Sequence, residues 1–292
     1  MVFDKWQSNG NDYILVEEEG LPFELTPARI RLLCSRHLGV GSDGILLLSA
    51  TFDRGCSGGM RVFNPDGSED EMSGNGACQA AAYLNRLRGQ AGGRVDLQTA
   101  AGPVHVEVAL DGACRLYMGR ASLRSRDFPS GPPDGRGVLR AAGADISFRH
   151  VFVGNPQCAI ELARPLDSEA FQARARAIET HAQFPNRTNV SFWCRESERE
   201  ISARIFERGV GETLSSTTGA CGAAVAAVLA GVLSPLTVRM PGGDLDVEVD
   251  EQFSLVVRNC ATHVFSGALS ASLMDRLRCL GSSPLVGSSR SL

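Results

Sequence analysis

The chain has 292 residues, a formal net charge of −4 and 43% hydrophobic residues. That length fits one large domain or two of medium size, and the composition can bury a core. The acidic balance argues against nucleic-acid binding, and no apolar run reaches the roughly 20 residues that span a bilayer. The first residues lack the apolar core of a secretory signal, and the nine cysteines show no paired spacing. We therefore expect a cytoplasmic protein without a disulfide framework.

The first predicted helix begins at Pro27, with Thr26 as its N-cap, and runs to about His37. Residues 60–63 are strand-like and lead through a polar, glycine-containing loop into a second predicted helix, Ala77–Leu87. Alternating apolar and polar residues predict two more strands, Val104–Val108 and Leu245–Val249.

Residues 128–137 are rich in proline and glycine and are predicted to form a loop or a connection between domains. A surface helix is expected over Ser168–His181, with Ser168 as its cap. A strand over Ile201–Phe206 then precedes the helix Ala220–Leu233. Because that last helix is apolar on every side, we expect it to lie inside its domain. The Ser/Gly-rich tail, residues 281–292, is predicted to be disordered.

The two halves of the chain repeat each other. Arg61–Asn64 recurs as Arg204–Glu207, and Ser73–Cys78 recurs as Ser216–Cys221, in both cases 143 residues later. Gly10-Asn11-Asp12 has a counterpart in Gly154-Asn155-Pro156 at an offset of 144 residues. Three matches in order at nearly one offset indicate a duplicated domain, because the period is too long for a solenoid.

Each repeated loop ends at the N-terminus of a predicted helix. Free backbone N–H groups at such ends attract carboxylate or phosphate groups. Two of these helix ends, one in each half, could bind one anionic substrate from both sides of a cleft. The alternative is that both loops are simple helix caps, but their duplication favours a function.

Seven motifs, in order from residue 3 to about residue 267, resemble those of the diaminopimelate epimerase family. They are Ser8–Tyr13, Arg36–Gly44, Phe63–Glu69, Ser73–Ala77, Gly154–Pro156, Pro185–Val190 and Glu207–Thr213. The resemblance implies an α+β fold of two pseudo-symmetric domains, each a barrel-like sheet around a central helix. We place the first domain at residues 1–118 with residues 264–280, and the second at residues 119–263.

The resemblance implies racemisation or epimerisation at the α-carbon of an amino-acid-like or carboxylate substrate, without a cofactor or a metal. It also allows a homodimer. Its two catalytic cysteine positions are Ser73 and Ser216 here. The positions implied to bind substrate are Asn11, Asn64, Gly74, Asn75, Asn155, Gln157, Asn189, Glu207, Arg208, Thr217 and Thr218. An alcohol ionises far less readily than a thiol, whose pKa is about 8.5, so two serines form a weak pair for proton abstraction.

Besides the two serines, three further residues differ from the family's pattern. Gln157 replaces a histidine, Thr217 replaces a glycine, and Cys78 replaces an arginine. An engineered Cys→Ser replacement explains the two serines alone, whereas divergence to another reaction explains every departure. A double-bond isomerase that moves an allylic proton therefore stays an alternative, as does an inactive, amino-acid-binding protein.

Other polar residues near the repeated loops have simpler interpretations. Cys78 and Cys221 lie more than one turn inside their helices and are expected to pack in the core. Asp66, Glu69 and Glu71 precede Ser73 and are expected to be solvated, although any of them could serve as a base if it turned inward.

Overall fold

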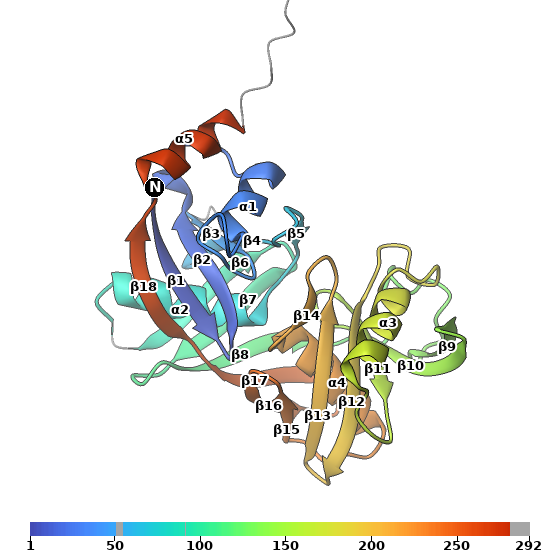
Figure 1. Ribbon diagram of the computed structural model, residues 1–292. Coiled ribbons are helices and arrows are strands. Elements are labelled where there is room, and N and C mark those ends of the chain that lie inside the picture. The colour runs from blue at the N-terminus through green and yellow to red at the C-terminus, as the bar shows by residue number, and fades with distance from the viewer. Residues whose placement is uncertain (51–54, 91, 281–292) are drawn as a thin grey trace, which may run out of the picture.

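A computed structural model describes residues 1–50, 55–90 and 92–280. The predicted tail lies outside these residues. The chain forms two lobes of similar build (Figure 1). In one, strands surround helix α2 (Gly74–Leu87), and in the other they surround helix α4 (Thr217–Leu229). This is the α+β architecture of two pseudo-symmetric units that the sequence predicts.

The first lobe contains nine strands of the described chain. They are β1 (Val2–Ser8), β2 (Asn11–Glu17), β3 (Ile45–Ser49), β4 (Gly58–Phe63), β5 (Glu69–Asp70), β6 (Gly93–Thr99), β7 (Gly102–Val108), β8 (Ala113–Arg120) and β18 (Thr262–Ala268). β1 pairs with β2, β2 runs parallel to β3, β3 pairs with β4, and β4 runs parallel to β6. β6, β7 and β8 then form an antiparallel meander.

The second lobe repeats these pairings strand for strand. Its strands are β9 (Arg136–Ala141), β10 (Ala144–Phe152), β11 (Pro156–Glu161), β12 (Asn189–Ser197), β13 (Glu200–Glu207), β14 (Gly211–Thr213), β15 (Leu236–Met240), β16 (Gly243–Val249) and β17 (Ser254–Cys260). β11 runs parallel to β12 and β13 runs parallel to β15, as β2 does to β3 and β4 to β6. The duplication read from the sequence is therefore also a duplication of topology.

The two lobes share strands at their junction. β8 pairs with β17 along seven residue pairs, from Ser254–Arg120 to Cys260–Ala113, so the sheets are continuous. The chain then crosses over. β9, which follows β8, pairs with β10 of the second lobe, and β18, which follows β17, pairs with β1 of the first. This exchange joins the two lobes through paired strands.

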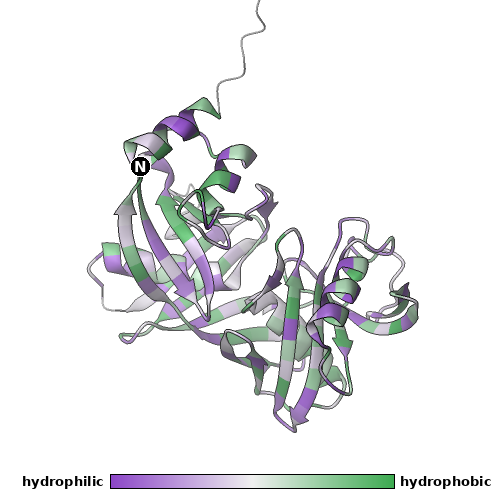
Figure 2. Cartoon of the chain, viewed as in Figure 1, coloured by the Kyte–Doolittle hydropathy of each residue, from purple (hydrophilic) through white to green (hydrophobic). Residues whose placement is uncertain are grey.

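The central helices are the core of the protein. α4 is buried from Thr217 to Ala227, as its all-round apolar sequence predicts, and α2 is buried from Gly74 to Tyr83. Residues of both helices belong to one continuous hydrophobic cluster. β13 alternates hydrophobic and hydrophilic residues along most of its length (Figure 2), and buried positions alternate with half-buried ones, which is the pattern of a sheet with one buried face. β12 is instead buried from Asn189 to Cys194, because α4 and α3 both pack against it.

The peripheral helices are α1 (Pro27–Cys34), α3 (Ser168–Glu179) and α5 (Ala271–Cys279), and a 3₁₀ turn spans Glu18–Gly20. α1 ends before His37, because Ser35 adopts an extended conformation. Thr26 is its N-cap by position, but its hydroxyl makes no capping hydrogen bond. The cap predicted at Ser168 is wrong, since the side chain of Asp167 accepts the amide of Ala170.

The prediction that α2 and α4 begin at alanine is wrong by three residues at each helix. Both begin directly after a serine, at Gly74 and at Thr217. Glycine, asparagine and threonine have weak helix propensity, so the first turn was not recognisable from periodicity. α4 also ends before its predicted end at Leu233. Its last residue is Leu229, and Gly231 follows with φ of 90°.

Candidate active site

Two equivalent serines begin the central helices. The Ser73 Oγ accepts a hydrogen bond from the Gly76 amide at 3.1 Å, and the Ser216 Oγ accepts one from the Gly219 amide at 3.2 Å. Serine is a preferred N-cap because its oxygen satisfies an amide that has no partner within the helix. The remaining amides of each first turn stay available to an anion.

The N-termini of the two helices meet head to head. The Thr217 hydroxyl donates to Asn75 Oδ1 at 2.6 Å, which ties α4 to α2. The same oxygen accepts from Asn259 Nδ2 at 2.8 Å. Asn75 Nδ2 in turn donates to Asn11 Oδ1 at 3.0 Å and to the Ser215 carbonyl at 3.2 Å. Asn75 is 1% exposed, so this network is a buried link between the lobes.

Gly74 allows the two helix ends to approach this closely. A Cβ at residue 74 would lie 2.6 Å from Thr217 Cβ and Cγ2 and 3.1 Å from Leu116 Cδ2. We expect Gly74→Ala to force the ends apart and to lower the free energy of unfolding by about 1–3 kcal/mol, the usual cost of overpacking. Urea unfolding measures this, with Gly58→Ala as control, since a Cβ there makes only ordinary contacts. Equal stability of the two variants would contradict the close approach.

A small pocket lies between the helix ends. It is lined by Asn11, Tyr13, Asp70, Met72, Ser73, Gly74, Asn75, Glu207, Ser216, Thr217 and Thr218. Its volume is about 10 Å³, which is room for about one water molecule. The pocket as it stands is therefore too small for an amino acid, and a substrate could enter only if the helix ends moved apart.

Tyr13 is the partner of the first serine. Its phenol oxygen lies 3.1 Å from Ser73 Oγ. Burial and the nearby carboxylate of Glu207 raise the pKa of Tyr13 far above its usual value. The phenol is therefore neutral across the ordinary pH range. It can share a hydrogen bond with Ser73, but it gives up its proton only at a high cost in free energy.

Glu207 is the partner of the second serine. Its carboxylate accepts a hydrogen bond from the Thr213 hydroxyl at 2.7 Å, and the nearby Ser216 hydroxyl also favours its ionised form. Burial raises the pKa of Glu207 to about 7, although these two hydroxyl groups oppose the shift. A carboxyl group with this pKa is suited to general base catalysis near neutral pH.

Arg208 bridges the lobes close to this pocket. Its guanidinium forms ion pairs with Glu71 and with Asp70, whose Oδ1 lies 3.3 Å from Nη2. Burial, followed by a hydrogen bond with Glu71, raises the pKa of Asp70 to about 8. Glu71 keeps a pKa below its usual value, since Asp70 and Arg208 hydrogen-bond it and Arg208 is positively charged. Glu71 is a loop residue with a side chain that is 38% exposed, as expected, but it also pairs with Arg208 beside the pocket.

Five residues that the resemblance assigns to substrate binding, Arg208 among them, do not line this pocket. Asn64 donates to Ser68 Oγ at 3.1 Å within its own turn, and Asn189 accepts the Arg208 amide at 2.7 Å. Asn155 donates to Thr218 Oγ1 at 3.4 Å and accepts from Gln157 Nε2 at 2.6 Å. Gln157 is fully buried against α4, and its Oε1 has no partner. Of these four amide side chains, Asn155 is hydrogen-bonded to a pocket residue, Thr218.

The sequence interpretation missed Tyr13, Asp70 and Met72 as pocket residues. Tyr13 and Asp70 stand in or beside motifs already recognised, so proximity to a motif was the available signal. Glu69 and Asp66, in contrast, are exposed, and Glu69 pairs with Arg61 at 2.8 Å.

Cys78 and Cys221 are both fully buried, as expected of residues that pack in the core. Burial raises the pKa of the Cys221 thiol to about 12. Cys78 keeps a raised pKa because it hydrogen-bonds with Cys114 and is buried. Both thiols are therefore protonated at neutral pH.

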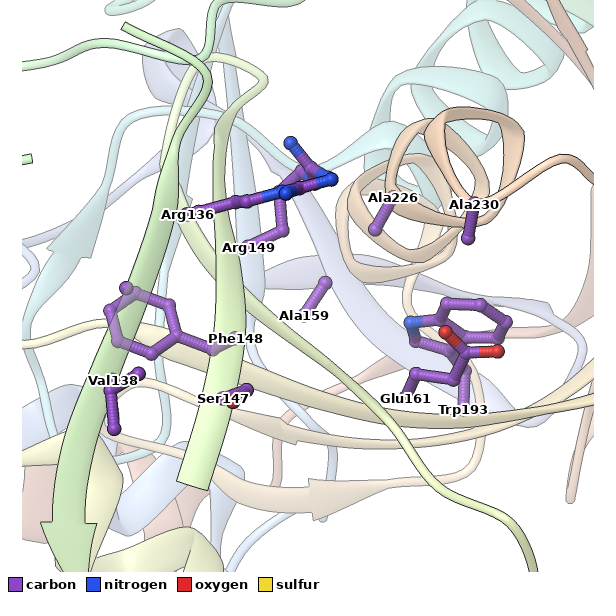
Figure 3. A pocket seen from close by; sticks show the side chains of 11 residues that line it. Arg136, Val138, Ser147, Phe148, Arg149, Ala159, Glu161, Trp193, Ala226 and Ala230 are labelled. Carbon is purple, nitrogen blue, oxygen red and sulfur yellow. The ribbon is translucent and has the colours of Figure 1, made fainter. Parts of the chain in front are cut away.

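A separate cavity of about 410 Å³ lies in the second lobe, between the β9–β10 hairpin and α4 (Figure 3). Arg136 and Arg149 line one side and Glu161 and Trp193 the other, and none of the pocket residues named above contributes to it. Within the described ranges, no group of three or more His, Cys, Asp or Glu residues could hold a metal ion. None of the helices described is long and apolar enough to cross a membrane.

Comparison with known proteins agrees with this architecture. A family model described as diaminopimelate epimerase matches residues 3–124 and 149–264. The diaminopimelate epimerases of Pelotomaculum thermopropionicum and Desulforudis audaxviator are each 39% identical to the chain, over 91% of it and 98% of each relative. The crystal structure of a hydroxyproline epimerase from Agrobacterium vitis superposes with a TM-score of 0.71 and 14% identity, over 91% of both chains, and so shares the fold.

Proposed function

Because the chain belongs to the diaminopimelate epimerase family and is an isomerase, we propose that it transfers a proton at the α-carbon of an amino-acid-like substrate. The proposed result is racemisation or epimerisation without a cofactor. The observation that carries this proposal is the head-to-head meeting of α2 and α4, each with a cap serine in one pocket. The substrate carboxylate would bind the free amides of both helix ends.

The Glu207 side of the pocket supplies the base. Ser216 Oγ would take the α-proton while its own hydroxyl proton passes to Glu207. The C–H bond breaks, the electron pair stays on the substrate as an enolate, and Glu207 ends the step protonated. The amides at the two helix N-termini would stabilise the negative charge that develops on the carboxylate.

The Tyr13 side would return a proton to the opposite face. Ser73 would donate its proton to carbon and be reprotonated by Tyr13, which ends as a phenolate. Because the pKa of Tyr13 is raised and that of Glu207 is about 7, this end state is costly. Solvent must then remove the proton from Glu207 and restore the one on Tyr13.

This asymmetry favours a second candidate, the shift of a double bond by an allylic proton transfer. One group that removes and returns a proton suffices for that reaction. In the described chain the carboxylate of Glu207 lies near Ser216, whereas Ser73 contacts the phenol of Tyr13. The more acidic proton of an unsaturated substrate would also suit a carboxylate base.

Hydrogen exchange in D₂O, followed by mass spectrometry, tests the proposal. The panel holds LL- and meso-diaminopimelate, glutamate, histidine, proline and lysine, with no added cofactor. We expect deuterium at the α-carbon of at least one of them, with exchange faster than inversion.

Ser216→Ala is the matched variant, because it removes the hydroxyl that links the substrate to Glu207. Exchange that survives in this variant would overturn the assignment of the base. Binding by calorimetry without exchange on any substrate would contradict the racemase and support an amino-acid-binding protein. Exchange only on an unsaturated acid would support the double-bond isomerase.

A further inference from the structure

The cavity of about 410 Å³ in the second lobe lies apart from the pocket between the helix ends. It separates α4 from one face of the strands β9 to β12 (Figure 3). Of the α4 residues that line it, Ala226 lies nearest to Ser216, and the ten residues between them span about 15 Å along the helix. Small-molecule sites have volumes of about 300–1,000 Å³, so this cavity has room for a ligand of its own.

Two arginines stand directly opposite each other on one wall of the cavity. Arg136 of β9 pairs in register with Arg149 of β10, and both side chains line the cavity. Like charges at directly opposed positions destabilise an antiparallel strand pair. Burial, followed by the charge of Arg136, lowers the pKa of Arg149, so the two guanidinium groups are close enough to repel each other.

Asp134 neutralises only part of this positive charge. Its Oδ2 lies 3.4 Å from Arg136 Nε, and its main-chain carbonyl accepts a hydrogen bond from Arg149 Nη1 at 2.5 Å. Arg149 forms no ion pair with any residue that the structure describes. A carboxylate bound between the two guanidinium groups would supply the missing negative charge, and arginine is well suited to hold it.

The opposite wall presents a carboxylate and an indole N–H group. Glu161 of β11 pairs in register with Trp193 of β12. Among the described residues, the Glu161 carboxylate has neither a hydrogen bond nor an ion pair. Trp193 is 2% exposed and its Nε1 has no acceptor. That nitrogen faces Ala159 and the arginine wall in Figure 3. A buried donor without an acceptor is unfavourable, so this wall also lacks a partner.

Short apolar side chains lie between the two walls. Ala226 of α4, Ala230 at the C-terminal end of this helix and Ala159 of β11 line the cavity. Because alanine side chains are short, they leave space between the helix and the sheet. The ring of Trp193 adds apolar surface beside them. An aliphatic chain could therefore bury its methylene groups between the charged walls.

We propose that this cavity binds a small zwitterion whose carboxylate and ammonium groups stand at opposite ends of a short aliphatic chain, as in an ω-amino acid. The carboxylate would lie between Arg136 and Arg149, and the ammonium would lie at Glu161. A phosphate would satisfy the arginines alone and leave Glu161 without a cation. The site lies outside the pocket of the proposed reaction and does not depend on that reaction.

Calorimetric binding to the wild-type protein provides the first test. The probe is 6-aminohexanoate, and hexanoate and hexylamine share its six-carbon chain but each lack one of its charges. We expect 6-aminohexanoate to bind at least about fivefold more tightly than either, because one partly exposed ion pair contributes a factor of this size. Inorganic phosphate should bind more weakly than 6-aminohexanoate.

Two substitutions assign the ends of the ligand. Arg149→Gln should weaken the binding of 6-aminohexanoate at least about fivefold and leave that of hexylamine within about twofold. Glu161→Gln should weaken 6-aminohexanoate by the same factor and leave hexanoate within about twofold. Arg140→Gln is the matched control, because Arg140 lies in the same hairpin but pairs with Asp145 at 3.1 Å, outside the cavity. This control should keep the wild-type affinity.

Tryptophan fluorescence locates the bound ligand. The chain has two tryptophans, Trp6 and Trp193, and neither lines the pocket between the helix ends. Trp6→Phe leaves Trp193 as the only tryptophan, and 6-aminohexanoate should change its emission with the affinity that calorimetry gives. Binding without a change in that emission would place the ligand elsewhere and overturn the proposal. If this variant did not fold, the Arg149 and Glu161 variants would still decide.

Equal affinities for 6-aminohexanoate and hexanoate would overturn the proposal, as would tighter binding of phosphate or no detectable binding of 6-aminohexanoate. Losses of the same size in Arg149→Gln and Arg140→Gln would contradict the assigned wall. None of these measurements uses proton exchange, so a failure of this proposal and a failure of the proposed function are distinguishable.

Discussion

Glu207→Gln should lower the rate of α-proton exchange by at least about 100-fold, the usual contribution of a general base. Glutamine can still accept the hydrogen bond from Thr213, but it cannot take a proton from Ser216. In the wild-type protein the exchange rate should rise as the pH passes about 7, because Glu207 must lose its proton to act. The glutamine variant should lack this step in its pH profile, which initial rates in D₂O buffers from pH 5 to 9 would show.

The same substitution should stabilise the fold at high pH. The pKa of Glu207 is about 7 in the folded protein and near 4.5 in an unfolded chain. Between these values the folded state binds more protons, so its stability falls as the pH rises through this window. Above pH 7 the buried, ionised carboxylate lowers the free energy of unfolding, and glutamine removes this cost because it carries no charge. Urea unfolding at pH 5 and pH 8 should therefore show a larger gain for the variant at pH 8.

Glu212→Gln is the control for both measurements. Glu212 lies on β14 and pairs with Arg204 at 2.8 Å, away from the pocket. It should leave exchange within about twofold of wild type, as expected for a partly exposed ion pair outside the site. If Glu207→Gln kept its exchange rate, or lost stability at pH 8 relative to pH 5, Glu207 would not be the base described above.

Asn75→Ala should cost about 4 kcal/mol of unfolding free energy. Its side chain makes four hydrogen bonds at the junction of α2 and α4. Alanine leaves their partners in a buried space, and each unsatisfied polar group costs about 1–3 kcal/mol. Denaturant unfolding gives this value, and a second, lower transition would show that the lobes have lost their coupling.

Asn85→Ala provides the comparison on the same helix. Asn85 is 2% exposed, but its amide makes one long hydrogen bond, 3.5 Å to the Gly93 carbonyl, and its Oδ1 has no partner. We expect this variant to lose about 1 kcal/mol, the net value of a single hydrogen bond. Similar losses in the two variants would show that the link between the helices does not stabilise the fold.

Sequence reasoning identified the features that repeat locally. The duplication and the buried character of α4 follow from residue order and apolar pattern alone, whereas Ser73 and Ser216 were singled out by the family resemblance and not as helix caps. The first turns of α2 and α4 do not follow from the pattern, because Gly74 and Thr217 are weak helix formers that the head-to-head packing holds in place.

The charge pattern of the site was also beyond local reasoning. Arg208 meets Asp70 and Glu71 across 137 or more residues of chain, and Tyr13 meets Ser73 across 60. Such pairs arise from the sheet register, which places β2, β5 and β13 around the ends of two helices. A motif can mark where a substrate binds, but not which of its neighbours neutralise one another.

The serine cap of α4 has a consequence for the acid–base chemistry of the pocket. The Ser216 Oγ accepts the Gly219 amide, and the Ser216 hydroxyl also lies near enough to Glu207 to favour the ionised form of that carboxyl group. The side chain that begins α4 is therefore also the neighbour of the proposed base, Glu207. A cysteine thiol accepts the hydrogen bond from the Gly219 amide only weakly. Replacing serine by cysteine therefore alters helix initiation and the group beside Glu207 together. A substitution at residue 216 therefore changes the start of the helix and the acid–base chemistry at the same time.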